Sequence, residues 1–232
     1  MVKYVNSNDS TIFNSSTYFY DSTGRLIRKA DTVVFHGSLQ STGSTEYIYE
    51  PGKVVAVTLN DTNQLTYYFQ EETMLIDSIV PDENSILQIC KVFRNANNEI
   101  DSVQYLSASN RSLLGMNKNF IYDNGNIVRF NTFNEMAEDI GFSTITYDNQ
   151  LLAKEGMDGL GSSSLYNNAN KPYAIVFAKS RYMCKSSVTY IHLLTGSLLH
   201  NYLKNTPTEV IDSLTENIDG ITFTNIVQYL YY

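Results

Sequence analysis

Tyr18-Phe19-Tyr20-Asp21-Ser22-Thr23-Gly24-Arg25-Leu26 places aromatic residues before a turn and an aliphatic residue after it. The same order returns in Phe120-Ile121-Tyr122-Asp123-Asn124-Gly125-Asn126-Ile127. Asp and Asn side chains hydrogen-bond the backbone two residues on, and Gly adopts the positive φ that closes a tight turn. Aromatic and β-branched residues on either side suit a pleated, partly buried surface. Both stretches therefore predict β-hairpins.

Degenerate copies of the phrase occupy residues 47–54, 93–100 and 145–151. Consecutive aromatic anchors lie 19 to 29 residues apart, which leaves about one hairpin for each interval. The anchors are Tyr20, Tyr49, Phe69, Phe93, Tyr122, Tyr147, Tyr166 and Tyr190. An irregular period of this size favours an array of hairpins that bury their faces against their neighbours. The alternative is that a Tyr-rich antiparallel protein yields such spacings by chance.

The Tyr-x-Tyr-Asp-x-x-Gly-Arg-Leu phrase resembles the YD repeat of Rhs-like proteins. It is still more similar to a family of secreted lipoproteins of unknown function from gut-dwelling Gram-negative bacteria. The resemblance covers residues 18–177 and implies successive antiparallel hairpins in one extended, twisted sheet. Only the copies at Tyr20 and Tyr122 keep both Asp and Gly, whereas those at Phe69 and Tyr166 lack the Asp.

The resemblance also implies where the protein works. It predicts an exported lipoprotein of the periplasm, the outer membrane or the cell surface, attached to membrane only through an N-terminal lipid anchor that this chain does not contain. The residues themselves show no hydrophobic signal region at 1–8 and no apolar stretch as long as a transmembrane helix. Export is therefore inferred from the resemblance alone.

Composition bounds the fold and its partners. The chain has 232 residues, is 43% hydrophobic and 17% charged, and can bury a sizeable core. We predict a single, mainly β domain over residues 1–232, with a possible loop or seam at 156–164 where Gly and Ser accumulate. The net charge of -8 opposes contact with phosphate backbones, so no nucleic-acid partner is expected.

The C-terminal region departs from the hairpin pattern. Thr206-Pro207-Thr208-Glu209 matches a capping box, with Pro at the first helical position. Val210, Ile211 and Leu214 would form an apolar stripe, and Gly220 would stop the helix. The sequence thus predicts one helix over about 207–217, followed by a closing strand or short hairpin.

The three histidines and two cysteines offer the strongest candidates for a metal site or a crosslink. A turn centred on Gly196 would place His192 opposite His200, but zinc needs three or four ligands and His36 is the only other histidine. We therefore expect structural histidines and no metal or other cofactor. Cys90 and Cys184 allow one disulfide or two free thiols in strands, and both readings remain open.

The remaining candidates concern catalysis and modification. Glu71-Glu72 and the acidic run 135–139 do not place two carboxylates around one bond, and no serine elbow or phosphate-binding loop occurs. We assign no catalytic, cofactor-binding or metal residues. Asp followed by Ser or Thr and then by a small or aliphatic residue resembles the O-glycosylation sequon of gut bacteria and recurs six times, at Asp9, Asp21, Asp31, Asp77, Asp101 and Asp212.

Two functions fit this pattern. The first is an exported, non-catalytic binding or scaffold protein that contacts a glycan or a protein through a sheet face rich in Tyr and Asn. The second is an exported carbohydrate-active hydrolase, which requires two converging carboxylates. The absence of such a pair from the sequence pattern favours the first.

Overall fold

The computed structural model describes residues 2–6, 12–35, 38–59, 64–73, 75–82, 88–152, 182–191 and 194–230. These residues form sixteen strands, all antiparallel to their neighbours. In chain order the first eight are β1 (Val2–Asn6), β2 (Ile12–Tyr20), β3 (Leu26–Phe35), β4 (Ser38–Glu50), β5 (Lys53–Leu59), β6 (Gln64–Phe69), β7 (Ile76–Pro81) and β8 (Gln88–Arg94). The others are β9 (Ile100–Ser107), β10 (Leu113–Asp123), β11 (Asn126–Asn134), β12 (Asp139–Leu152), β13 (Tyr182–Ile191), β14 (Leu194–Thr206), β15 (Glu209–Ile218) and β16 (Ile221–Leu230).

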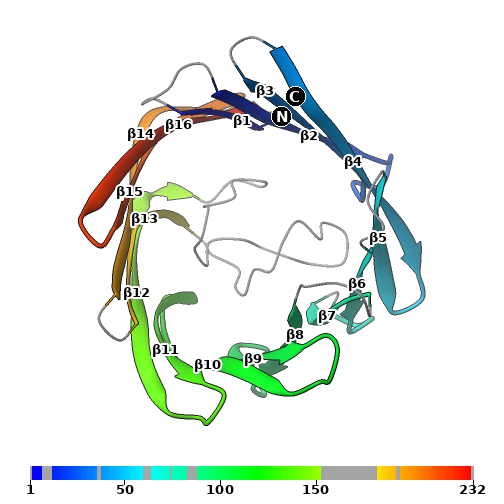
Figure 1. Ribbon diagram of the computed structural model, residues 1–232, viewed down its shortest axis with the longest axis vertical. Coiled ribbons are helices and arrows are strands. Elements are labelled where there is room, and N and C mark those ends of the chain that lie inside the picture. The colour runs from blue at the N-terminus through cyan, green and yellow to red at the C-terminus, as the bar shows by residue number, and fades with distance from the viewer. Residues whose placement is uncertain are drawn as a thin grey trace.

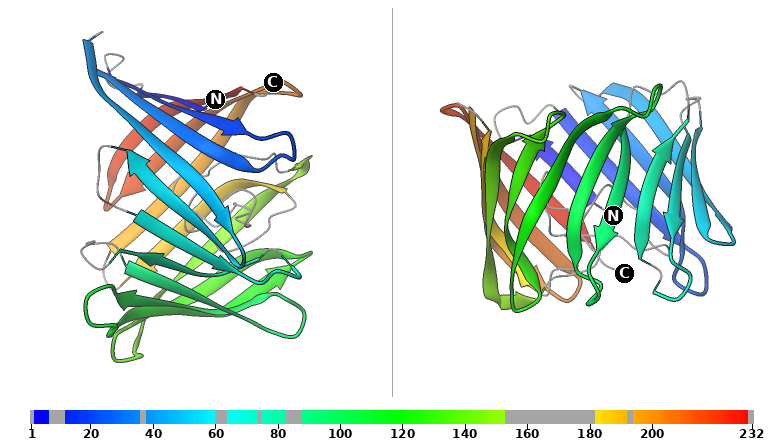
Figure 2. Two further views of the ribbon diagram at one scale, coloured as in Figure 1. Left: turned by 90° about the vertical axis from the view of Figure 1, so that its right-hand side faces the viewer. Right: turned by 90° about the horizontal axis from the view of Figure 1, so that it is seen from below.

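The sheet closes into a barrel, which Figure 1 shows from one open end. Each strand pairs with the next one along the chain, and β1 pairs with β16 from Val2↔Tyr229 to Asn6↔Asn225. The strands are tilted around the wall, as Figure 2 shows. The hairpins predicted at residues 18–26, 47–54, 93–100 and 120–127 are confirmed, whereas the one predicted at 145–151 is wrong, because these residues continue β12. The sheet they build, however, closes on itself instead of extending, because the last strand has the first as its neighbour.

The predicted turn chemistry is present in the hairpin between β2 and β3. The Asp21 Oδ1 atom accepts hydrogen bonds from the backbone N–H groups of Thr23 at 2.8 Å and Arg25 at 2.9 Å. Gly24 follows with a φ of +81°. Asn95 accepts from Asn97 and Glu99 in the same way between β8 and β9. In these two turns the Asp or Asn that opens the turn supplies the bonds, whereas the turn at 124–125 is closed by Asn124 and Gly125 with φ values of +51° and +79°.

The predicted helix over about 207–217 is wrong. No described residue is helical. The described part of the chain therefore contains no helix that could cross a membrane. The Thr206 Oγ1 atom does accept from the Glu209 N–H at 3.1 Å, as a capping box requires, but it also donates to the Glu209 carbonyl at 3.1 Å and closes a two-residue hairpin. Glu209 to Ile218 then pair with β16 along their whole length. The same hydrogen bond closes a turn here because the residues after it pair with β14 on one side and with β16 on the other.

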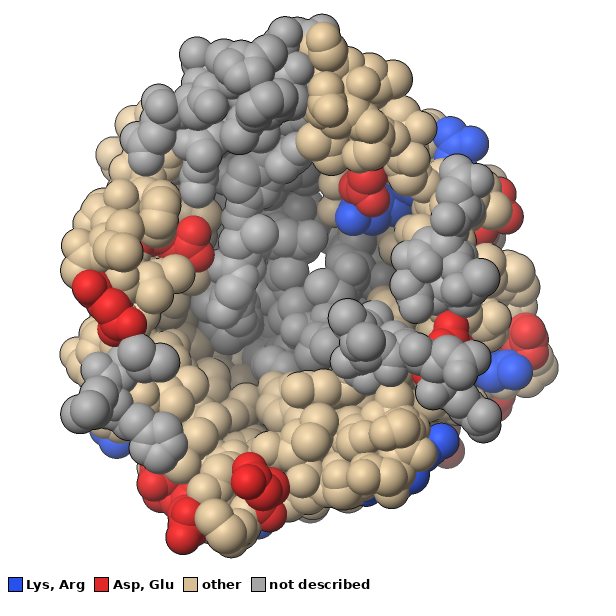
Figure 3. Space-filling view, in the orientation of Figure 1, with Lys and Arg blue, Asp and Glu red and all other residues tan. Residues whose placement is uncertain are grey.

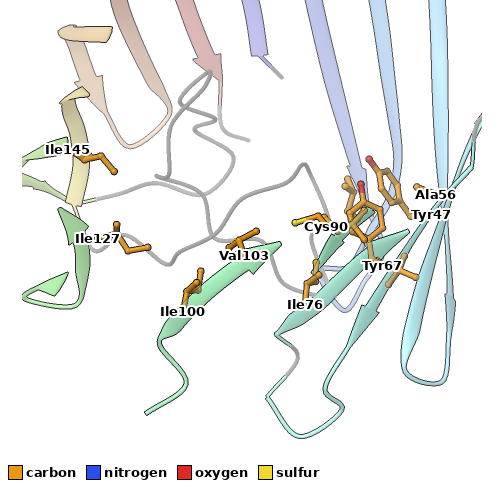
Figure 4. Packing of buried hydrophobic residues seen from close by; sticks show 12 residues of the cluster. Tyr47, Ala56, Tyr67, Ile76, Cys90, Ile100, Val103, Ile127 and Ile145 are labelled. Carbon is orange, nitrogen blue, oxygen red and sulfur yellow. The ribbon is translucent and has the colours of Figure 1, made fainter. Parts of the chain in front are cut away.

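One face of the sheet carries the apolar core. Buried side chains including Tyr47, Tyr67, Cys90, Val103 and Ile145 point toward the inside of the barrel (Figure 4). Directly opposed residues such as Tyr67↔Ile79 and Cys90↔Tyr105 share this inner face, because side chains alternate along each strand. The inner wall from β3 to β12 is therefore mainly aliphatic and aromatic.

The outer face of the barrel wall is largely polar from β12 to β16. Cross-strand hydrogen bonds join hydroxyl and amide groups there, at 2.7 Å between Thr146 and Ser186 and at 2.8 Å between Asn217 and Thr222. The register places further Ser, Thr and Asn side chains on the same outer face, namely Thr144, Ser197, Asn201, Ser213, Thr215 and Thr224. On these strands the outer face is mainly polar, with Leu199 as an apolar side chain that is 51% exposed on the same face.

Candidate functional site: the tyrosine rim and the slot between β7 and β8

The turns of the repeated phrase all lie at one rim of the barrel, here called the tyrosine rim. It contains the turns at residues 21–25, 51–52, 70–75, 95–99 and 124–125, each of which joins an even-numbered strand to the next odd one. Antiparallel strands bring all such connections to the same end. Tyr190 is an exception among the predicted anchors, because it lies near the far end of β13, at the opposite rim. The anchor Tyr166 and the possible seam at 156–164 lie outside the described residues.

Successive hairpins diverge at the tyrosine rim, and tyrosine hydroxyls bridge them. The ladder between β3 and β4 ends at Arg28↔Glu46, and beyond it the Tyr49 hydroxyl donates to the Leu26 carbonyl at 2.9 Å. The hydroxyl of Tyr122 donates to Ile100 at 2.9 Å, and that of Tyr147 to Ile127 at 2.7 Å. Each bond gives a partner to a carbonyl beyond the last pair of the ladder. This explains why the second tyrosine of the phrase recurs.

Burial changes the acidity of these tyrosines. Desolvation raises the pKa of Tyr122 to about 12 and raises the pKa of Tyr49 as well, because the phenolate is disfavoured away from water. The pKa values of Tyr67 and Tyr105 are also raised by burial. Most of the tyrosines whose side chains the structure describes are therefore part of the inner packing and not of an exposed binding face. Tyr20, Tyr68 and Tyr190 remain 42–43% exposed.

Arg94 takes the tyrosine position between β7 and β8. β7 and β8 pair only at Ser78↔Lys91 and Ile79↔Cys90, after which they diverge toward the tyrosine rim. The Arg94 guanidinium bridges the gap, with Nη2 3.5 Å from the Ile76 carbonyl and Nη1 3.2 Å from the Asn98 carbonyl. A pocket of about 430 Å3 lies there, called the slot below.

The slot combines charged, amide and aromatic groups. Its lining includes Gln70, Asp77, Lys91, Phe93 and Arg94. Burial raises the pKa of Asp77, an effect opposed by the nearby Arg94 charge and by a hydrogen bond from Gln70. Desolvation likewise lowers the pKa of Arg94, although the guanidinium remains protonated at neutral pH. The Asp77 carboxyl group and the Arg94 guanidinium are therefore both partly shielded from water.

A second pocket of about 460 Å3 lies at the opposite rim. Its lining is largely apolar or neutral and includes Leu114, Met116, Phe133 and Thr132, with Glu135 as its one carboxylate. It therefore offers fewer directional contacts than the slot.

His200 forms a buried pair with Asp212 instead of facing His192. The His200 Nδ1 atom lies 2.6 Å from the Asp212 Oδ2 atom, and both side chains are at most 3% exposed. The Asp212 Oδ1 atom also accepts from the Asn201 N–H at 3.0 Å. The hairpin predicted around Gly196 is wrong, because Gly196 lies inside β14 and pairs with Thr189 and Ile218.

The other candidate ligands and acids do not converge. His36 and His192 lie outside the described residues, within which no cluster of three His, Cys, Asp or Glu side chains could hold a metal ion. Glu71 and Glu72 are exposed in the turn between β6 and β7. The run 135–139 forms the turn into β12, where the Glu138 carboxylate accepts from the Asn134 amide at 2.7 Å.

Cys90 is a free, fully buried thiol on the inner face of β8. Burial raises its pKa to about 12. Cys184 lies on β13, with four strands between it and β8 around the wall, and strands about 4.8 Å apart cannot bring the two Cα atoms within disulfide range across that arc. The pairing of Cys90 with Cys184 is therefore not formed.

The six Asp-Ser/Thr sites differ in exposure. Ser22 is exposed in the first turn, whereas Ser102 is buried and Thr32, Ser78 and Ser213 are half-buried within strands. The site at Asp9 lies outside the described residues. Among the described sites, Ser22 alone is freely accessible to a modifying enzyme in the folded protein.

The sequence analysis missed both the slot and the His200–Asp212 pair. A signal for the slot was present, because Val92-Phe93-Arg94-Asn95 aligns with Tyr47-Ile48-Tyr49-Glu50 and puts a cation at the tyrosine position. The anchor predicted at Phe93 is one residue too early, because Arg94 occupies the tyrosine position. No local signal connects His200 with Asp212, since their contact depends on the register of the β14–β15 hairpin.

Comparison with solved structures identifies porin-like proteins of the same fold. One, from Bacteroides uniformis, is 12% identical, has a TM-score of 0.71, and the match covers 99% of this chain and 96% of that one. Another, from Bacteroides vulgatus, is 11% identical with a TM-score of 0.58, over 100% of this chain and 96% of that one. No family model matches the sequence. No curated protein matches it either. At this level of identity the likeness shows a shared fold.

Proposed function

We propose that this chain is an exported, non-catalytic binding or scaffold protein that contacts a glycan or a protein through the outer wall of its barrel. The observation that carries the proposal is the composition of that wall. Exposed aromatic side chains, among them Phe19 at 38%, Tyr68 at 43% and Phe93 at 43%, lie on β2, β6 and β8, and Ser, Thr and Asn side chains are frequent on the outer face of β12 to β16. Aromatic rings offer contact area at low entropic cost, and amides and hydroxyls provide hydrogen bonds.

A pore is the function suggested by the words porin-like in the neighbours' descriptions. A membrane-spanning barrel needs an outward apolar band about 25 Å tall, with a polar interior. Here the inner wall is the apolar one, and Lys91 and Lys118 project from the outer face. A lysine at the bilayer midplane costs about 2–4 kcal/mol. Ile48 and Ile121 are also exposed on the outer face, so the support for a wall that faces water comes from the outward lysines and the apolar inner wall.

The hydrolase remains the second candidate of the sequence analysis. It would require two carboxylates about 5–9 Å apart in a cleft. Among the described residues Asp212 is the one buried carboxylate, and it is bonded to His200. The slot holds one carboxylate, Asp77. These placements favour binding over glycoside hydrolysis.

Charge and resemblance support the partners and the location that we propose. Lys and Arg side chains are scattered singly around the face seen in Figure 3, next to acidic ones, and the net charge is -8. A nucleic-acid partner would require clustered cations. The resemblance to YD-repeat lipoproteins and the porin-like neighbours both favour the periplasm, the outer membrane or the cell surface.

The test has three arms. The chain purified without detergent should remain monodisperse in aqueous buffer, should not raise the conductance of a planar lipid bilayer, and should be retarded in native gels that contain a polysaccharide, without releasing reducing sugar. Channel conductance would contradict the water-facing wall. Polysaccharide turnover that disappears when one carboxylate is replaced would contradict the non-catalytic assignment.

A further inference from the structure

The slot exists because the repeat is broken at one position. Where Tyr49, Tyr122 and Tyr147 close the gap between successive hairpins with a phenol ring, Arg94 reaches across with a thinner guanidinium. The ladder between β7 and β8 is also the shortest in the barrel as described, with only two paired positions. Together these features leave an open, lined space in an otherwise continuous wall.

Arg94 is held in place by the protein itself. Its two terminal nitrogens donate to the carbonyls of Ile76 and Asn98, and its Nε is buried without a hydrogen-bond partner among the described residues. Lys91 and Asp77 line the same space but form no ion pair within 4.0 Å in the described part of the chain. The slot thus offers the Lys91 ammonium group and the Asp77 carboxylate, which accepts a hydrogen bond from Gln70 and keeps further acceptor capacity, beside an anchored cation.

The groups of the slot that remain available to a ligand carry opposite charges. Arg94 already donates to two carbonyls, and Lys91 and Asp77 present one charge of each sign, so an ion attracted to one of them would be repelled by the other. A hydroxyl group meets both demands, because it donates to a carboxylate and accepts from an ammonium group. Such charge-assisted hydrogen bonds are about twice as strong as neutral ones.

The aromatic side of the slot indicates the rest of the ligand. Phe93 is 43% exposed and presents an apolar ring next to the polar groups. A sugar ring has hydroxyl groups at its edge and apolar C–H groups on its face, and it fits a pocket with a few convergent polar groups and one aromatic surface. A pocket of about 430 Å3 is large enough for one or two sugar units.

We propose that the slot between β7 and β8 binds a neutral sugar residue, with Asp77 and Lys91 bonding its hydroxyl groups and Phe93 stacking on its face. This inference rests on the proposed binding function and names its site and ligand class. Gln70 and Asn98 provide further amide contacts at the two ends of the slot.

Affinity electrophoresis of the whole chain tests the site, with yeast mannan, soluble starch and arabinoxylan as neutral probes and polygalacturonate as the anionic probe. The variants are compared in the neutral gel that retards the wild-type chain. There, Phe93→Ala and Lys91→Ala should each lower the apparent affinity by about tenfold or more. The matched controls are Phe223→Ala, whose ring is also 43% exposed but lies on β16, and Lys118→Ala on β10. Both controls should bind as the wild type does.

The possible results separate the site from the function. Equal loss of binding in Phe93→Ala and Phe223→Ala, or unchanged binding in both slot variants, would leave glycan binding intact but overturn the slot as its site. If polygalacturonate is the one probe that retards the chain, the proposal of a neutral sugar ligand is wrong. Absence of wild-type retardation in every gel would overturn the glycan-binding function and, with it, the slot. Gel filtration of each variant excludes unfolding as the cause.

Discussion

Replacing Tyr49 by Phe removes one hydroxyl from the tyrosine rim and leaves its ring in place. The lost hydrogen bond to the Leu26 carbonyl is 2.9 Å long, and the side chain is half-buried. A hydrogen bond contributes about 0.5–1.5 kcal/mol net, and a buried carbonyl left without its partner costs about 1–3 kcal/mol. Because water reaches part of the rim, we expect a loss of about 1–2 kcal/mol in the free energy of unfolding.

Urea unfolding followed by tyrosine fluorescence measures this loss as a lower midpoint at unchanged slope. Tyr68→Phe is the control, because Tyr68 is 43% exposed on the outer wall and its variant should stay within about 0.5 kcal/mol of the wild type. The triple variant with Tyr122→Phe and Tyr147→Phe should lose about three times as much, since distant sites add. If Tyr49→Phe and Tyr68→Phe have the same midpoint, the hydroxyl does not hold the hairpins together and the reasoning fails.

Gly24→Ala should cost about 1 kcal/mol because its φ is +81°, whereas Gly196→Ala, without a positive φ and with nothing within 4 Å, should be neutral or slightly stabilising in the same urea assay. Equal effects would contradict the turn assignment. Cys90, with its pKa raised to about 12, should resist iodoacetamide at pH 8 in the folded protein and react in urea, as peptide mass spectrometry would show. Rapid native labelling would contradict its burial. The pKa of Tyr122 is raised from 10.0 to about 12, so its contribution to stability is complete below pH 10 and disappears as the pH rises toward 12; absorbance at 295 nm should show ionisation coupled to unfolding. Asp212→Asn should lose about 3 kcal/mol because it removes the charge that His200 contacts, and an unchanged thermal midpoint would refute that role.

The repeated turns were predictable because their chemistry is local. An Asp or Asn side chain that bonds the backbone two and four residues on, followed by Gly at positive φ, needs no distant partner. The aliphatic residue after each turn was equally legible, and Leu26 and Ile127 are indeed among the most buried side chains. The slot was not predicted from the sequence, although Arg94 occupies the position at which the phrase has tyrosine.

The segment after Thr206 shows where local chemistry fails to decide. The Thr206–Glu209 hydrogen bond forms, but it fits both the first turn of a helix and a tight hairpin. The apolar stripe of Val210, Ile211 and Leu214 suited a helix, whereas the buried side chains of β15 are those of Val210, Asp212 and Leu214, at the alternation of a strand. Pairing with both β14 and β16 determines the outcome.

Most hairpins and their turns could be predicted from the sequence, because they depend on neighbours within a few residues along the chain. The closure of the sheet, the contact between His200 and Asp212, and the place of Arg94 in the slot became visible in the folded structure alone. Closure requires the first strand to pair with the last, from Val2 to Tyr229. Contacts over such separations carry no periodic signal in the chain, because they depend on the accumulated twist and register of every strand between them.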